Sequence, residues 1–131
     1  MFDWINYIYL AKVLIERNDE ESLRSAISRL YYGVFGIVRR YLINVKNKYD
    51  LLNPNPNIHY EIYKDLKRSS NTTEKQMANI LNCLRHVRNN ADYDWEDEYD
   101  LDFFKDFLNK NREELIIPFD ALSYLKKHPN Y

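Results

Sequence analysis

Residues 20 to 46 carry apolar side chains at helical spacing over a longer stretch than any other part of the chain. From Leu23 to Leu42 these side chains recur every three or four positions, and toward the centre they surround much of the predicted helix. Such a helix must be covered on several sides, so we expect it in the middle of a helical bundle. Gly33 and Gly36 lie inside it, and each costs about 1 kcal/mol relative to alanine. Their presence predicts that another helix or a subunit packs closely against them.

Shorter helical patterns account for most of the remaining sequence. A first helix is predicted over about residues 2 to 16, and Asn18-Asp19 then offers a cap for the long second helix. The apolar stripe of the first helix is expected to comprise Ile5, Ile8, Tyr9, Val13 and Leu14.

A break rich in asparagine and proline, residues 47 to 57, separates these helices from the others. A third helix follows, with Ile58, Ile62 and Leu66 spaced by four. Thr73 and Gln76 form a capping-box pattern that opens a fourth helix running to about residue 90. The fifth starts near Tyr99, and Pro118 either kinks it or begins a short last segment.

Composition fits one helical domain. The chain has 131 residues with only 2 glycines and 4 prolines, which argues against a turn-rich β sandwich or barrel. We therefore expect a single all-α domain over residues 1–131, an antiparallel bundle of four to five helices. The one cysteine, Cys83, excludes an intramolecular disulfide and favours a cytoplasmic location. The apolar N-terminal stretch is broken by charge at Glu16-Arg17, so we expect neither a membrane span nor a signal peptide.

Arg88 is predicted to point inward from the fourth helix. At about 100° per residue, with Leu81 set at zero, Arg88 falls at about 340° and Asp92 at about 20°, beside the apolar stripe, whereas His86 falls at about 140° on the far side. An inward guanidinium needs a partner, and Asp92 at i+4 is the nearest candidate. Two interpretations stay open: an ion pair that closes the helix end, or an arginine that lines a cleft shared across a dimer.

Seven acidic residues lie between Asp92 and Asp102, with no lysine or arginine among them. The simplest interpretation is a solvated loop whose negative charge favours the N-terminus of the fifth helix. A docking surface for a basic partner is the alternative. The carboxylates would also repel a phosphate backbone nearby. Asp92 and Asp94 lack a third ligand at a telling spacing, so we expect no metal and no cofactor.

Two segments together resemble HEPN-domain proteins. The first contains Ser28, Arg29, Tyr31 and Tyr32 within SAISRLYYGVFGIVRRYL (25 to 42), and the second is RNNADYD (88 to 94). His59 also stands where many of these proteins have a histidine. The resemblance covers roughly residues 20 to 110, and its specificity lies in the order and pairing of both segments.

The resemblance implies a homodimeric antiparallel bundle from a prokaryotic toxin–antitoxin, stress or phage-defence system, often beside a minimal nucleotidyltransferase. Active HEPN ribonucleases carry an arginine, then four to six residues, then a histidine, and need no metal. Arg88 matches that arginine and Asn89 the polar residue that commonly follows it. Asp92, Tyr93 or Asp94 takes the place of the histidine, so the acid–base group that the family mechanism uses is missing.

Two functions follow from this pattern. The first is a non-catalytic or weakly catalytic dimeric interaction module, with a nucleotidyltransferase or another protein as its partner and Tyr93 as a nucleotidylation target by analogy. The second is a metal-independent endoribonuclease that uses Arg88 with an unconventional proton donor, such as His59 or a tyrosine. The net charge of −1 provides no global basic field for nucleic acid. If the protein contacts RNA, we expect the contact at Arg29, Arg85 and Arg88.

Overall fold

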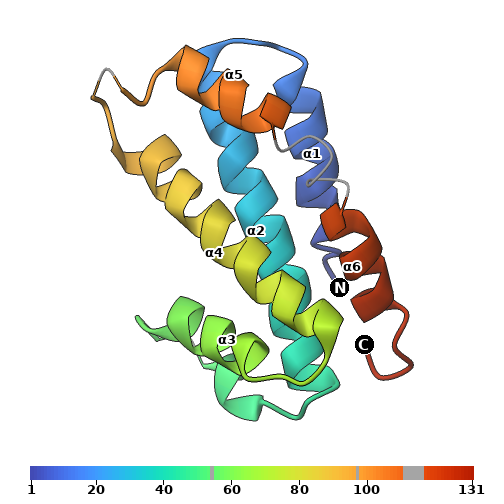
Figure 1. Ribbon diagram of the computed structural model, residues 1–131. Helices are drawn as coiled ribbons and strands as arrows, with labels where there is room; N and C mark the ends of the chain where they lie inside the picture. The colour runs from blue at the N-terminus through green and yellow to red at the C-terminus, as the bar shows by residue number, and fades with distance from the viewer. Residues whose placement is uncertain (54, 97, 111–116) are drawn as a thin grey trace.

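The chain folds around α2 (Glu20–Asn44), which passes through the middle of the molecule (Figure 1). The computed structural model describes residues 1–53, 55–96, 98–110 and 117–131. Over these residues the other elements are α1 (Ile5–Ile15), the 3₁₀ helix η1 (Tyr49–Leu52), α3 (Ile58–Lys67), α4 (Thr72–Tyr93), α5 (Leu101–Lys110) and α6 (Ile117–Lys126). More than half of α2 is buried, because α1, α4, α5, α6 and η1 all pack against it.

The predicted all-α bundle is confirmed, with one difference in the number of helices. The described residues contain six α-helices and no strand, whereas four to five helices were expected. The difference arises beyond residue 100, where α5 and α6 are separate helices. Pro118 is the second residue of α6, so it marks the start of a last segment and does not kink the fifth helix. In Figure 1, α1 and α4 both run opposite to α2.

Side-chain caps fix where α2 and α4 begin. The carboxylate of Asp19 accepts a hydrogen bond from the Ser22 amide at 2.8 Å, as the cap prediction required. For α4 the prediction was wrong: the cap is Asn71, whose side-chain oxygen accepts from the Glu74 amide at 3.0 Å. The helix therefore starts before the capping box proposed at Thr73.

The start of α1 packs closely against the two glycines of α2. A Cβ atom built on Gly33 would lie 2.7 Å from Cγ1 of Ile8, and one built on Gly36 would overlap the ring of Trp4. Neither position has room for the Cβ atom of an alanine, so the close approach that the glycines predicted is confirmed. The element that approaches is α1 of the same chain, and no second subunit is needed to explain them.

The expected apolar stripe of α1 is wrong in part. Ile8 and Ala11 are its buried residues, whereas Tyr9 and Val13 are exposed. The reason is that α1 is apolar on both sides, so spacing alone cannot tell which side meets α2. None of the described helices is long and apolar enough to cross a lipid bilayer.

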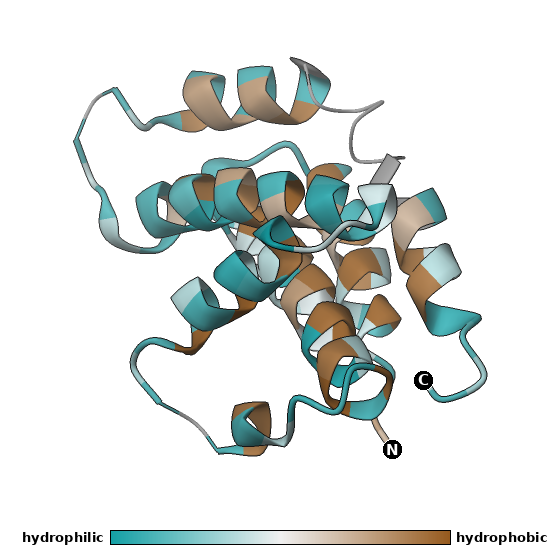
Figure 2. Ribbon diagram, turned by 60° about the horizontal axis from the view of Figure 1, so that its bottom comes forward, coloured by the Kyte–Doolittle hydropathy of each residue, from teal (hydrophilic) through white to brown (hydrophobic). Residues whose placement is uncertain are grey.

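The helix α3 packs against α4 (Figure 1) and buries Ile58, Ile62 and Leu66, the three residues whose spacing predicted this helix. Its approach is set by the preceding break. Arg39 on α2 donates from Nε to the carbonyl of Leu51 at 2.8 Å, and Leu51 itself is fully buried. In Figure 2 hydrophobic residues gather where the helices face one another, and the connecting loops are mostly hydrophilic.

Candidate functional site

The packing of α2 against α4 brings together the two segments singled out in the sequence. Arg88 lies 3.6 Å from the Asp92 carboxylate and donates to the hydroxyl of Tyr32 at 3.3 Å. Ser28 donates to the same Asp92 carboxylate at 3.3 Å. The predicted inward direction of Arg88 and its i,i+4 pair with Asp92 are thereby confirmed, and His86 is exposed on the far side as expected.

Arg88 is almost enclosed by aromatic rings. Its guanidinium carbon lies 5.1 Å, 5.4 Å and 5.8 Å from the ring centroids of Tyr31, Tyr32 and Tyr93. The residue is only 6% exposed, and its Nε has no hydrogen-bond partner among the described residues. A cation desolvated to this extent is held by Asp92 and by the electron-rich ring faces together.

Arg29 extends this arrangement toward α1. Its guanidinium carbon lies 4.8 Å from the ring centroid of Tyr7 and 6.0 Å from that of Tyr32. Tyr32 is thus a neighbour of both Arg29 and Arg88. Arginines and tyrosines alternate along the junction of α1, α2 and α4.

His59 joins the cluster from the first turn of α3. Its Nδ1 shares a short hydrogen bond with the hydroxyl of Tyr31, and its ring lies 4.6 Å from that of Phe35 between centroids. Burial lowers the pKa of His59, and the positive charges of Arg85 and Arg88 lower it further. Burial also raises the pKa of Tyr31 to about 12. At neutral pH both groups are therefore uncharged, with the Tyr31 hydroxyl able to donate to Nδ1.

Arg85 stands next to His59 but outside the Arg88–Asp92 pair. Together with Tyr31, Phe35, Tyr60, Tyr63 and Asn82 it lines a cavity of about 210 Å³ where α2, α3 and α4 meet. Its Nε is buried and has no hydrogen-bond partner among the described residues. The sequence placed Arg29, Arg85 and Arg88 in one group. In the structure Arg29 and Arg88 both contact the ring of Tyr32, whereas Arg85 lines a separate cavity together with His59.

The residues of the second segment differ in what they contact. Asn89 is half-buried, and no described hydrogen bond involves its side chain. Tyr93 is 70% exposed although its ring faces Arg88. Asp94 acts through its backbone carbonyl, which accepts from Arg24, and no described interaction joins its carboxylate to Arg88.

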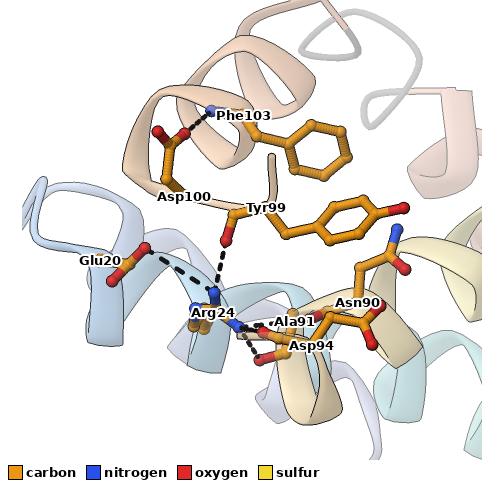
Figure 3. A network of polar contacts seen from close by, with 8 residues as sticks. All are labelled: Glu20, Arg24, Asn90, Ala91, Asp94, Tyr99, Asp100 and Phe103. Atoms are coloured by element: carbon orange, nitrogen blue, oxygen red, sulfur yellow. Dashed lines mark hydrogen bonds and ion pairs between the residues drawn. The ribbon is translucent and has the colours of Figure 1, made fainter. Parts of the chain in front are cut away.

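Arg24 is a residue whose role the sequence did not indicate. One guanidinium nitrogen donates to the carbonyls of Asn90, Ala91 and Asp94, and the other to the carbonyl of Tyr99 (Figure 3). Its guanidinium carbon also lies 4.7 Å from the ring centroid of Phe104 on α5. A single side chain of α2 therefore fixes the end of α4, where Asp92 and Tyr93 are placed. The carbonyls that Arg24 contacts are more than 60 positions away in the sequence, so no pattern near residue 24 indicates these hydrogen bonds.

Part of the acidic run forms the N-terminus of α5. The carboxylate of Asp100 accepts from the Phe103 amide at 3.0 Å and so caps α5 (Figure 3). Asp102 follows in the first turn of α5, where negative charge is favourable. Trp95 is exposed in the same connection. Asp97, another member of the run, lies outside the described residues.

The described residues contain no group of three or more histidine, cysteine, aspartate or glutamate side chains that could hold a metal ion. Comparison of the chain with protein-family models, with curated proteins and with solved structures gives no match. The function must therefore be argued from the geometry of the site.

Proposed function

We propose that the chain is a HEPN-type helical protein of a prokaryotic toxin–antitoxin, stress or phage-defence system, and that it works as a non-catalytic or weakly catalytic dimeric interaction module. The observation that carries this proposal is the environment of Arg88. In a ribonuclease of this kind the arginine must face the scissile phosphate and stabilise its charge. Here the guanidinium is buried, paired with Asp92 and covered by three tyrosine rings.

The electrostatics next to Arg88 argue in the same direction. Asp92 is one of the three residues that take the place of the family histidine, and its side chain is 26% exposed. This carboxylate and the acidic residues that follow it in the sequence would repel a phosphate that approaches Arg88. No described hydrogen bond or ion pair joins Arg88 to a histidine.

The outer side of α1 supports an interaction role and suggests the dimer surface. Tyr9, Leu10 and Val13 are all exposed and lie on one stripe of that helix. An exposed apolar stripe on one side of a helix is typical of a surface that meets a partner. We propose that two copies of the chain pair through it.

Two measurements test this proposal. Incubation of the purified protein with total RNA in EDTA should give no cleavage above that of an Arg88→Ala variant. Light scattering after size exclusion should give a dimer that Val13→Asp dissociates, whereas Leu52→Asp, an equally exposed apolar residue outside α1, leaves it intact. RNA cleavage that Arg88→Ala abolishes would refute the non-catalytic assignment, and a monomeric protein would refute the dimer.

The proposed partner is a minimal nucleotidyltransferase encoded beside this chain. Tyr93 is the proposed acceptor because it is exposed and belongs to the segment that resembles the family. Co-expression followed by intact-mass measurement should show addition of a nucleotidyl group that Tyr93→Phe removes. Retention of the modification in Tyr93→Phe would exclude this residue as the acceptor.

A second candidate function is favoured by the position of His59. An imidazole that is neutral at pH 7 and lies beside Tyr31, Arg85 and Arg88 can serve as a general base in a metal-independent endoribonuclease. The same RNA assay separates the two functions. Cleavage that is lost in both His59→Ala and Arg88→Ala would support the nuclease, and its absence supports the interaction module.

A further inference from the structure

Besides the cavity at His59, the structure has a pocket where the start of α1 meets the C-terminal half of α2 and η1. Its volume is about 300 Å³, at the lower end of the roughly 300–1,000 Å³ of small-molecule sites. The lining is mostly apolar and includes the side chains of Trp4, Phe35, Ile43 and Leu52. The pocket therefore has room for one ring or one hydrocarbon chain of modest length.

The rim and walls of this pocket leave apolar surface in water. Leu52 is 57% exposed, Met1 is fully exposed, and Trp4 and Phe35 are half-buried. The indole ring of Trp4 lies directly against Gly36, where no side chain of α2 intervenes. A ligand that covers these groups removes apolar area from water, and each CH₂ group that it buries raises its affinity by about fourfold.

Two arginines of α2 provide positive charge at the same pocket. Arg39 donates from Nε to the carbonyl of Leu51 at 2.8 Å and from one terminal nitrogen to that of Leu52 at 3.2 Å. Arg40 donates from Nε to the carbonyl of Tyr131 at 3.0 Å, and its guanidinium carbon lies 4.3 Å from the centroid of the Tyr131 ring. These contacts hold both half-buried guanidinium groups in place. They leave one terminal nitrogen of Arg39 and both of Arg40 without a hydrogen bond to a described residue.

No carboxylate neutralises these two arginines within the part of the chain that the structure describes. None of the residues that line the pocket is acidic, and no described ion pair involves Arg39 or Arg40. Asp3, the acidic residue next to Trp4, is bound by Lys126, whose ammonium group lies 2.9 Å from both carboxylate oxygens. Guanidinium groups bind carboxylates through charge-assisted hydrogen bonds, so an anionic head group complements this part of the pocket.

Apolar walls beside two guanidinium groups match an amphiphilic anion. Only Tyr32 and Asn44 add neutral polar groups to the lining, and the Tyr32 hydroxyl already accepts from Arg88. A nucleotide or a sugar would bury polar edges against apolar walls without partners, which weakens binding. An inorganic anion would leave the apolar walls uncovered. A pocket takes up one chain at a time, so a free acid fits it better than the flat surface of a bilayer does.

We propose that this pocket binds a free aliphatic carboxylate, a fatty acid of short to medium chain length. Its carboxylate contacts Arg39 and Arg40, and its hydrocarbon chain lies against Trp4 and Phe35. The site uses neither the Arg88–Asp92 pair nor the outer side of α1. It therefore goes beyond the proposed interaction role and requires neither dimer formation nor RNA cleavage.

Tryptophan fluorescence of the full chain tests the proposal, because Trp4 lines the pocket and the chain has only one other tryptophan, Trp95. In a Trp95→Phe background, decanoate should shift the emission of Trp4 to shorter wavelength. From hexanoate through octanoate and decanoate to dodecanoate, all below the concentration at which micelles form, affinity should rise by about fourfold per CH₂ group. It should stop rising once the chain fills the pocket. Decanol should bind roughly tenfold more weakly than decanoate, because it lacks the charge that the arginines bind.

Matched variants separate the two halves of the site. Arg40→Gln should weaken decanoate roughly tenfold and leave decanol unchanged, whereas Arg68→Gln at the end of α3 should change neither. Leu52→Asp places a negative charge at the rim and should weaken decanoate. Tyr60→Asp, a change at an equally exposed position on α3, should not. Circular dichroism and thermal unfolding would establish that each variant is folded.

A limit in chain length, together with the loss in Arg40→Gln, would establish the site. The proposal is overturned if none of the acids binds at millimolar concentration, if decanol binds as tightly as decanoate, or if Arg40→Gln and Arg68→Gln weaken binding equally. Binding to phosphatidylglycerol vesicles without binding of any free acid would also overturn it and would assign a membrane surface instead. None of these results bears on RNA cleavage or on the oligomeric state, so failure here leaves the proposed function untouched.

Discussion

Replacing Arg24 by methionine should loosen the end of α4 and destabilise the whole bundle. The methionine keeps the unbranched stem beside Phe104 but removes the guanidinium that donates to four backbone carbonyls. Three of those carbonyls belong to residues 90, 91 and 94 at the end of α4, where the last carbonyls of a helix lack intrahelical donors. Of the three, Asn90 also accepts from the Asp94 amide at 3.1 Å. The fourth, at Tyr99, ties the connection to α5.

The magnitude follows from the number of bonds and their exposure. A hydrogen bond is worth about 1 kcal/mol net, and one to a charged group about 1.5–3 kcal/mol. The Arg24 side chain is 21% exposed, and the released carbonyls can regain water, so the lower figure applies. One of the two nitrogens has only two N–H groups for its three acceptors, so the four contacts count as about three full bonds and give a loss of about 3 kcal/mol in the free energy of unfolding. Arg24→Lys should recover only part of this, because an ammonium group cannot reproduce the planar fork.

Urea unfolding followed by circular dichroism measures the loss in the free energy of unfolding of the whole chain. Hydrogen exchange measures the loss of protection at the end of α4. Glu20→Gln is the matched control, because Glu20 meets Arg24 only as a partly exposed ion pair at 3.8 Å. That change should cost at most about 0.5 kcal/mol. In Arg24→Met the amides around residues 91 to 101 should exchange faster. Equal stability of the two variants, with unchanged exchange in this segment, would refute the assigned role of Arg24.

Three further predictions concern the same region and the α1–α2 junction. Arg88→Met and Asp92→Asn should each reduce the free energy of unfolding by about 2–3 kcal/mol. The double variant should lose less than the sum of the two, because it leaves no buried charge without its partner. Strict additivity in a double-mutant cycle would contradict an interaction between Arg88 and Asp92. Because the pKa of His59 is lowered in the folded state, the unfolded chain binds a proton more readily, so stability should fall as pH drops below about 6.5. His59→Gln should remove this part of the pH dependence in denaturant titrations, whereas the exposed His86→Gln should not. Gly36→Ala should lower the melting temperature and the free energy of unfolding, the latter by about 1–3 kcal/mol, since its Cβ would overlap the indole ring of Trp4 at the start of α1. An unchanged melting temperature would show that Trp4 does not pack so closely.

The features that could be predicted from the sequence are those that depend on the residues of a single helix. The inward direction of Arg88 and its pair with Asp92 follow from helical periodicity within α4. The requirement for a close neighbour at Gly33 and Gly36 follows from the cost of glycine within α2. In each case the signal lies within a few turns of one helix, although which segment packs against the glycines could not be predicted in this way.

Other features depend on how helices meet, and periodicity does not contain that information. The exposed side of α1 was misassigned because both of its sides are apolar, and only the position of α2 selects between them. Arg24 contacts carbonyls of α4, and any residue type can provide a carbonyl, so no sequence pattern marks the partners.

The position of His59 shows how far a local break can determine the site. The imidazole reaches Tyr31 only because α3 begins where the preceding loop leaves it, and that loop is held by Arg39 donating to the carbonyls of Leu51 and Leu52. The place that the sequence resemblance gives to a histidine after Arg88 therefore holds Asp92, Tyr93 or Asp94 and no imidazole. A different imidazole instead enters from α3, beside Arg85 and not beside Asp92. Asp92 neutralises Arg88, whereas no ion pair among the described residues joins Arg85 to a carboxylate, so the less neutralised positive charge lies one turn of α4 before Arg88.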